Sequence, residues 1–193
     1  MAGRHPDTHF GNREESSMKI SKKNLAAQLF TIREYTKTPK DIAESMKKIK
    51  AIGYDAVQIS GLGPIDPKEL AAILDGEGLV CCASHDGGED LFNKTDALIE
   101  KLHTVKCSYV AYPWPHTSPK TEAERVALAK RLDAVGAKLR EAGINLCYHN
   151  HNNEVAKFNG RTAPDISYTA SRADNLKGEQ TRRHTSELQP MTN

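Results

Sequence analysis

Residues 141–151 read EAGINLCYHNH, and this short stretch contains one complete structural transition. A charged segment ends at Gly143, the type of residue that closes a helix in a left-handed conformation. An apolar run from Asn145 follows, and it ends in His149 and His151. Short, continuously apolar runs are typical of parallel strands that are covered on both faces. The stretch therefore predicts a helix end, a buried strand, and polar groups at the carboxyl end of that strand.

The same order recurs along the chain, as in AIGYDAV around Gly53 and GEGLVCC around Gly78. The apolar runs that predict strands cover residues 26–32, 55–60, 79–85, 109–115 and 145–151. Between them the apolar residues take helical spacing, as at Ile42, Met46 and Ile49, and again at Leu128, Leu132, Val135 and Leu139. Thr38-Pro39 and Asp66-Pro67 have the composition of helix starts. Strands that alternate with helices in this way predict an α/β fold with a parallel sheet, either open and doubly wound or closed as a barrel.

Nucleotide-binding motifs are absent from the loops where they would be expected. The segment REYTKTP after the first predicted strand has no G-x-G-x-x-G, and SGLGPID after the second has only two glycines. No G-x-x-x-x-G-K-[ST] sequence occurs either. The dinucleotide-binding version of the fold therefore loses its main support.

Composition excludes several classes of partner. The chain has 193 residues, enough for one domain, and 27 Lys plus Arg against 25 Asp plus Glu give a net charge of +2. That balance favours neither nucleic acid nor anionic lipid. No run reaches the roughly 18 apolar residues of a membrane span, and the first residues lack the apolar centre of a signal peptide. We therefore expect a soluble, cytoplasmic protein whose four cysteines are free and act as small buried hydrophobes.

Polar side chains follow the predicted strands where functional groups of parallel α/β folds gather. Gln58 and Ser60 end the second strand, and His85 and Asp86 follow the third. His85 and Asp86 could equally serve to cap the turn before a predicted helix, LFNKTDALIEKL.

The fourth and fifth strands are followed by similar groups. Trp114 and His116 come after the fourth, and Trp114 could pack at the rim or stack on a sugar. On the fifth strand, alternation places Cys147, His149 and His151 on one side, with Glu154 three residues further along. Imidazole plus carboxylate is a ligand set for borderline divalent metals, but a polar loop explains the same spacing.

Several of these motifs resemble those of a known protein family. The segments VQISGLGPID, YPWPH and YHNHNNEVAKF occur in the order, and at the strand ends, typical of the sugar phosphate isomerase/epimerase family of xylose isomerase-like TIM barrels. The chain resembles this family over residues 19–179. The resemblance implies an eight-stranded barrel with a divalent metal (Mn, Co, Mg or Zn) at its carboxyl-terminal mouth and proton transfer on a small sugar or sugar derivative through an enediolate. It also implies that Glu154 is a metal ligand, that His149 and His151 are catalytic groups in the sugar pocket, and that His85, Trp114 and His116 contact the substrate.

The sequence departs from the family at its ends. A complete barrel takes about 250 residues, and the pattern here gives about five of eight βα units, so we expect a partial TIM barrel over residues 19–179. Residues 1–18 have no counterpart in the family and are expected to form a disordered extension. Residues 180–193, QTRRHTSELQPMTN, stand where a strand with an aspartate ligand is expected, and we interpret them as a non-family, disordered tail that follows a truncation or a shift of reading frame. An open sheet would leave its first and fifth strands as unpaired edges, which favour a homo-oligomer.

Three functions remain open at this stage. The first is a sugar isomerase or epimerase whose metal site is impaired by the missing units. The alternative is a non-catalytic fragment that acts as a binding or assembly module. A third, an endonuclease of the same superfamily, is disfavoured because the lysines and arginines form no basic stripe.

Overall fold

The chain folds around a curved parallel sheet. The structure is a computed structural model, and it describes residues 25–113, 119–151, 157–158 and 160–179. The six strands of the main sheet lie in the order β1-β2-β3-β4-β5-β8, and every neighbouring pair is parallel. They are β1 (Ala27–Gln28), β2 (Ala56–Ile59), β3 (Val80–His85), β4 (Tyr109–Tyr112), β5 (Asn145–His149) and β8 (Lys177–Glu179). The predicted α/β fold with a partial barrel of parallel strands is confirmed.

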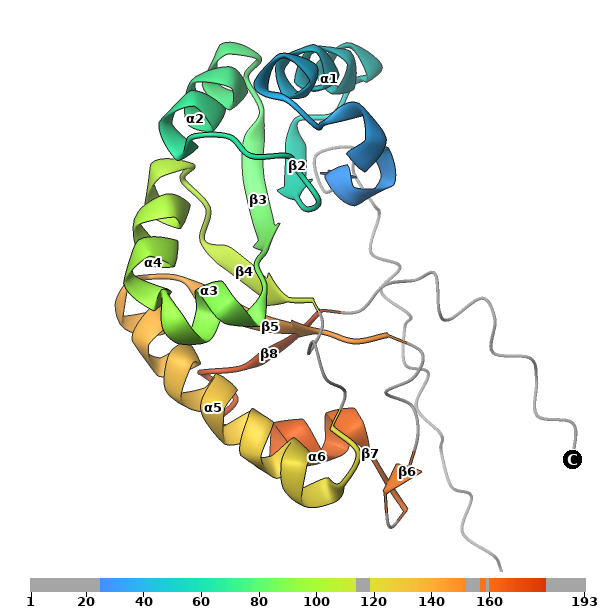
Figure 1. Cartoon of the computed structure of the whole chain (residues 1–193), viewed down its shortest axis with the longest axis vertical. Helices are drawn as coiled ribbons and strands as arrows, with labels where there is room; N and C mark the ends of the chain where they lie inside the picture. The colour runs from blue at the N-terminus through green and yellow to red at the C-terminus, as the bar shows by residue number, and fades with distance from the viewer. Residues whose placement is uncertain (1–24, 114–118, 152–156, 159, 180–193) are drawn as a thin grey trace, which may run out of the picture.

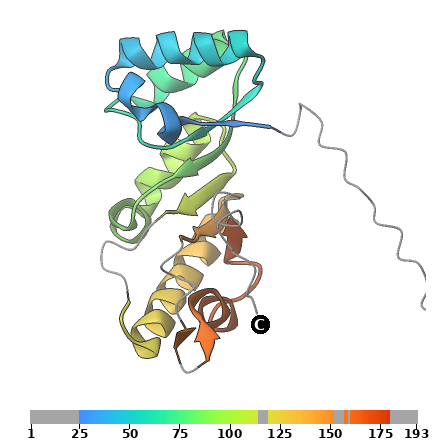
Figure 2. The same ribbon diagram turned by 90° about the vertical axis from the view of Figure 1, so that its right-hand side faces the viewer.

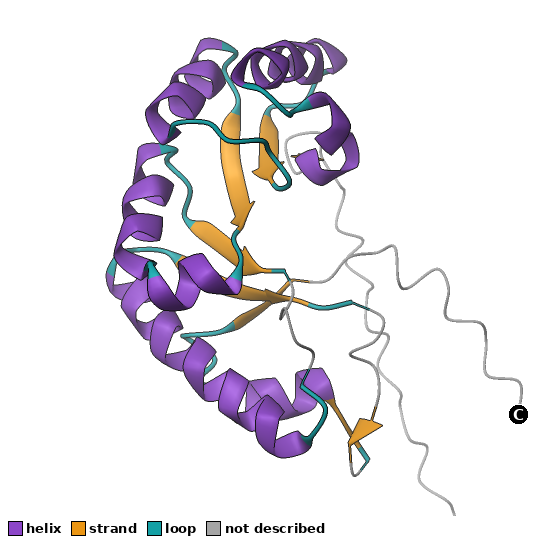
Figure 3. Ribbon diagram, in the orientation of Figure 1, coloured by secondary structure: helices purple, strands orange, loops and turns teal. Residues whose placement is uncertain are grey.

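Helices α1, α2, α4 and α5 lie along the convex side of this sheet (Figures 1 and 3). The helices of the described part are η2, a 3₁₀ segment (Leu29–Tyr35), α1 (Pro39–Ile52), α2 (Pro67–Gly76), α3 (Gly88–Asn93), α4 (Thr95–Thr104), α5 (Glu122–Glu141) and α6 (Ala163–Thr169). A short antiparallel pair, β6 (Lys157–Phe158) and β7 (Arg161–Thr162), precedes α6. In the view turned by 90°, α1 and α2 lie at one end of the molecule and α5 and α6 at the other (Figure 2).

The helix boundaries follow from local signals in the sequence. Thr38 caps α1 in a reciprocal capping box with Asp41, and Pro39 occupies the first turn, where its missing N–H costs nothing. Asp66 accepts hydrogen bonds from the first backbone N–H groups of α2. Gly53 ends α1 with φ of 108°, a left-handed conformation that a β-carbon would strain. These predicted starts and stops are confirmed.

The core lies between the sheet and the helices. Strand residues that alternate along β2 and β5 point into it, including Val57, Leu146 and Tyr148, all at most 2% exposed. The predicted helix faces meet them, with Ile42 and Met46 of α1 fully buried. The opposite face of each strand lines the concave side, and this alternation leaves polar side chains free to meet there.

Two predicted elements differ from the structure. The apolar run 26–32 forms only the two-residue strand β1 and then turns into η2, because an apolar run of this length suits a short helix as well as a strand. The expected helix over LFNKTDALIEKL is divided at Lys94 into α3 and α4.

The prediction that the fifth strand is an edge is wrong. β8 pairs with β5 in parallel, with Cys147 opposite Lys177 and His149 opposite Glu179. In the described part of the chain the sheet edges are therefore β1 and β8. Association through these edges stays a prediction.

In the described part of the chain, no helix combines the length and the apolar character that crossing a bilayer requires.

Candidate functional site

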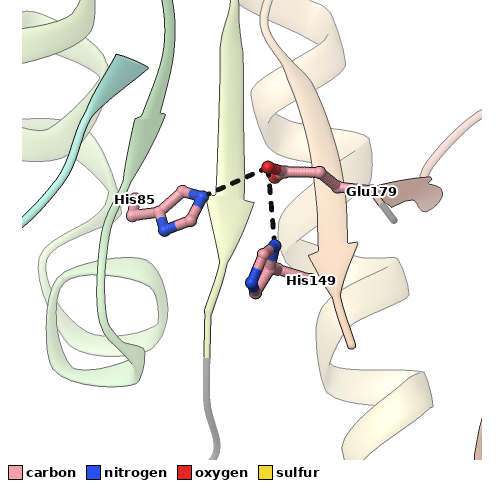
Figure 4. A group of neighbouring side chains, drawn as sticks. All are labelled: His85, His149 and Glu179. Atoms are coloured by element: carbon pink, nitrogen blue, oxygen red, sulfur yellow. Dashed lines mark hydrogen bonds and ion pairs between the residues drawn. The ribbon is translucent and has the colours of Figure 1, made fainter. Parts of the chain in front are cut away.

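Three side chains meet on the concave side of the sheet, each from the last residue of a strand. His85 ends β3, His149 ends β5 and Glu179 ends β8. The ends of parallel strands lie at one edge of a sheet, and the curvature of the sheet turns these three toward one another. Figure 4 shows the Glu179 carboxylate between the two imidazole rings. We call this group the His–Glu cluster.

One oxygen of Glu179 makes most of the contacts in the cluster. Gln58 Nε2 donates a hydrogen bond of 2.7 Å to Glu179 Oε1, and His85 Nε2 lies 3.3 Å from the same oxygen. His149 Nδ1 lies 3.4 Å away, an ion-pair contact without the angles of a hydrogen bond. Ser60 Oγ lies 3.3 Å from His85 Nδ1. Two polar residues near the end of β2 therefore support the cluster from the side.

These contacts set the charge of Glu179. Burial alone would raise the pKa of its carboxyl group, but the contacts with His149, His85 and Gln58 outweigh burial and hold the pKa well below its usual range. The side chain is 24% exposed, so solvent screens these contacts only in part. Glu179 is therefore a carboxylate at any pH near neutral.

This lowered pKa predicts a specific acid sensitivity in metal-free protein. As the pH falls below about 4.5, the unfolded chain takes up a proton at Glu179 while the folded chain does not, so the free energy of unfolding decreases. The stabilisation that the Glu179 carboxylate provides is fully present above about pH 4.5, and it is lost as the pH falls toward the pKa of Glu179 in the folded protein. Urea titrations between pH 7 and pH 3 with a chelator present should show a smaller acid loss in Glu179→Gln than in the wild type. Glu89→Gln, at an exposed ion pair with Lys94, should follow the wild type; identical curves for all three proteins would refute the assignment.

The donor atoms of the cluster fit a divalent cation. The ligand atoms of His85, His149 and Glu179 all lie within 4.8 Å of one another. Around one tetrahedral ion with bonds of about 2.1 Å, neighbouring ligand atoms are roughly 3.4 Å apart. The two contacts at Glu179 Oε1, 3.3 and 3.4 Å, match this separation, and the two imidazoles would move closer together where they lie up to 4.8 Å apart. His149 Nδ1 is buried without a hydrogen-bond partner, and a buried imidazole nitrogen normally has one. Two imidazoles and a carboxylate are a common ligand set for Zn²⁺ and similar ions.

The structure brings together some of the predicted site residues. His85 and His149 both belong to the cluster. His151 lies next to them, with its ring centroid 4.8 Å from that of His149 in an edge-to-face arrangement, in keeping with the predicted shared side. Trp114, His116 and Glu154 lie outside the described residues. The sequence does not single out Glu179, because the residues of β8, Lys177–Glu179, contain no apolar run that would predict a strand.

Asp86 has a structural role in the described residues. Its side chain is buried, accepts a hydrogen bond of 2.7 Å from Ser84 Oγ and forms an ion pair with Lys101 on α4. A buried charge of this kind requires such partners. The Asp86 carboxylate thus links β3, through Ser84, to α4, through Lys101.

The four cysteines are free, as expected. Cys81 and Cys107 are buried, whereas Cys82 and Cys147 are half-buried. Burial and the nearby charge of Glu179 raise the pKa of the Cys147 thiol to about 11. The thiol is therefore protonated at neutral pH, which argues against a nucleophilic role.

Comparison with solved structures identifies the fold. A sugar phosphate isomerase/epimerase from Parabacteroides distasonis is 19% identical, with a TM-score of 0.70, and the match covers 86% of this chain and 68% of that one. A xylose isomerase-like TIM barrel protein from Mycobacterium smegmatis, in complex with magnesium, is 14% identical with a TM-score of 0.62, over 86% of this chain and 67% of that one. A D-psicose 3-epimerase from Clostridium cellulolyticum, solved with D-tagatose, is 14% identical with a TM-score of 0.59, over 79% and 62%.

These matches show that the chain has a partial TIM-barrel fold, with six parallel strands in the main sheet of its described part. The structural neighbours include sugar isomerases and epimerases, in agreement with the resemblance in the sequence. A scan of family models found no match, and a search of curated proteins found none. At these identities the likeness establishes the fold, and function has to be argued from the site.

Proposed function

We propose that this protein is a sugar isomerase- or epimerase-like protein that binds a divalent cation and a small sugar or sugar derivative at the carboxyl ends of its strands. The observation that carries the proposal is the convergence of His85, His149 and Glu179 from three separate strands. The mouth of a TIM barrel is the place where such enzymes bind their substrates.

Each residue of the cluster has a role in the proposal. His85, His149 and Glu179 hold the cation, and Gln58 orients the Glu179 carboxylate through their 2.7 Å hydrogen bond. The low pKa of Glu179 suits a ligand, because it keeps the carboxylate ionised. A divalent ion, when bound, polarises neighbouring sugar oxygens as a Lewis acid.

The proton transfer itself is assigned to imidazole. His151 contacts the ring of His149 on the side of the strand end, where the sugar would lie. Imidazole is the side chain used most often to move protons near neutral pH. Glu154 remains a proposed further ligand, and Trp114 and His116 remain proposed sugar contacts.

The comparisons support the class of ligand. One neighbour was solved with D-tagatose and another with magnesium. A ketose and a divalent cation are the two components that the proposed site would accommodate.

A second candidate function follows from the same contacts. Gln58 of β2 and His85 of β3 contact Glu179 of β8 across the concave face. Gln58 lies 121 positions before Glu179 in the chain, and His85 lies 94 positions before it. The cluster would then hold the curved sheet together in a non-catalytic binding module. This alternative predicts a folded protein that moves no proton.

Solvent isotope exchange distinguishes the two functions. Purified protein in D₂O with Mg²⁺ or Zn²⁺ is incubated with a panel of ketoses, aldoses and their phosphates, and the carbon-bound protons are followed by ¹H NMR. We expect deuterium to enter at the carbon next to the carbonyl group of at least one sugar, and His149→Ala to remove this exchange. A folded, cation-loaded protein that exchanges no proton in the whole panel would exclude the isomerase proposal in favour of the binding module.

A further inference from the structure

A cavity of about 290 Å³ lies beside the His–Glu cluster and shares His85 with it. Its walls come from the end of β2, the β2–α2 loop, α2, and α4 with the residue after it. We call it the side pocket. Its volume is close to the lower limit of about 300 Å³ for small-molecule sites, so only a small ligand would fit.

One part of the side pocket is aliphatic. Its lining includes Ile59, Leu62, Ile65, Leu70 and Val105. Of these, Ile59, Leu70 and Val105 are at most 5% exposed and belong to the hydrophobic core, whereas Leu62 and Ile65 are half-buried. A ligand with an aliphatic body would remove the apolar surface of Leu62 and Ile65 from water on binding.

The other part of the side pocket is polar. Lys101 and Ser60 line it. The Lys101 ammonium has three donors, and Asp86, which is not among the lining residues, accepts one of them. The other Asp86 oxygen is bound by Ser84 Oγ at 2.7 Å. The buried Asp86 carboxylate is thus paired, and the Lys101 side chain, 34% exposed, has further ammonium donors for a ligand.

The loop that forms one wall is fixed in place. Gly63 N donates a hydrogen bond of 2.7 Å to the Thr36 carbonyl oxygen. A β-carbon at Gly63 would collide with the carbonyl oxygen of Lys37, so the two loops touch backbone to backbone. The side pocket is therefore preformed, which lowers the entropic cost of binding a ligand.

We propose that the side pocket binds a small aliphatic carboxylate, with the carboxylate group at Lys101 and the alkyl chain against Leu62 and Ile65. The Lys101 ammonium would favour a ligand with a carboxylate group, and the aliphatic lining would favour a ligand with an alkyl chain. The site does not depend on the cation at the His–Glu cluster, so the proposal stands or fails separately from the proposed function.

A chain-length series tests the apolar part of the proposal. Acetate, propionate and butyrate are titrated into ¹⁵N-labelled full-length protein at constant ionic strength and with a chelator present, and the amide shifts of the loop at residues 61–65 are followed. Each added methylene group should raise the affinity about fourfold if it is buried. Butanol and inorganic phosphate should both bind more weakly than butyrate, because each lacks one of the two features. Equal affinity along the series, or tighter binding of phosphate, would overturn the proposal.

Two variants with a matched control test the charge. Lys101→Gln removes the charge but keeps a donor for Asp86, and it should weaken butyrate binding at least about tenfold. Lys50→Gln is the control, because Lys50 also forms an ion pair, with Asp55 at 2.7 Å, and is 37% exposed, but it does not line the pocket. Ile65→Trp fills the pocket without touching the ion pair and should also abolish binding. Unchanged butyrate binding in Ile65→Trp, or an equal loss in Lys101→Gln and Lys50→Gln, would refute the site.

Discussion

We expect Mn²⁺, Co²⁺ or Zn²⁺ to raise the melting temperature of the wild-type protein, and we expect replacement of Glu179 with glutamine to abolish this rise. An ion present at 100 times its dissociation constant stabilises a folded protein by about 2.7 kcal/mol, which corresponds to a shift of roughly 5–10 °C for a domain of this size. Glutamine has nearly the same shape as glutamate but carries no charge, so the cation would lose its anionic ligand in the cluster. The measurement is a thermal melt of protein first stripped with a chelator, with and without added cation.

Two further variants make this experiment decisive. Glu89→Gln removes an exposed acid in an ion pair with Lys94 and should keep the full shift. Glu154→Gln tests the ligand that the sequence resemblance implied. If Glu154→Gln loses the shift while Glu179→Gln retains it, the cation lies at Glu154 and the His–Glu cluster serves only to hold the sheet together.

The sequence could predict the histidines of this site but not their acidic partner. His85 and His149 follow apolar runs, and the rule that parallel folds gather polar groups at the carboxyl ends of strands points to both. β8 consists of Lys177, Gly178 and Glu179, which contain no aliphatic side chain and so give no strand pattern. This strand forms because its backbone pairs with the edge of β5, which is distant in the sequence. The residues around β8 alone therefore do not predict it.

The same limit explains the other differences between prediction and structure. Capping residues and left-handed glycines were read correctly, since their causes lie within a few residues in the chain. The apolar run 26–32 predicts one strand, because apolar character alone does not distinguish a strand from the short helix η2. Contacts such as that of Gln58 with Glu179 depend on the curvature of the whole sheet.

The connection that leads into β8 is held by α5. Asp133 Oδ1 accepts hydrogen bonds from Arg172 N at 2.7 Å and from Asn175 Nδ2 at 3.0 Å. Asn175 is 4% exposed, and its backbone lies directly over Gly136 in the middle of α5. A β-carbon at Gly136 would collide with the Asn175 carbonyl oxygen. Glycine at this position therefore allows the close approach of backbone that places Glu179.

Gly136→Ala is consequently expected to destabilise the fold, although alanine is the better helix former. Alanine would gain up to about 1 kcal/mol from helix propensity. However, its β-carbon would collide with the backbone of Asn175, so the connection at residues 172–176 would have to shift. Overpacking of this kind typically costs about 1–3 kcal/mol. Gly76→Ala in α2 is the matched control, because its β-carbon would meet nothing within 4 Å, and it should be neutral or slightly stabilising. Urea unfolding of the three proteins gives the comparison. Because the connection at residues 172–176 leads to Glu179, Gly136→Ala should also reduce the cation-induced rise in melting temperature, and Gly76→Ala should not. A Gly136→Ala protein as stable as the wild type would show that the connection is free to move and does not position the site.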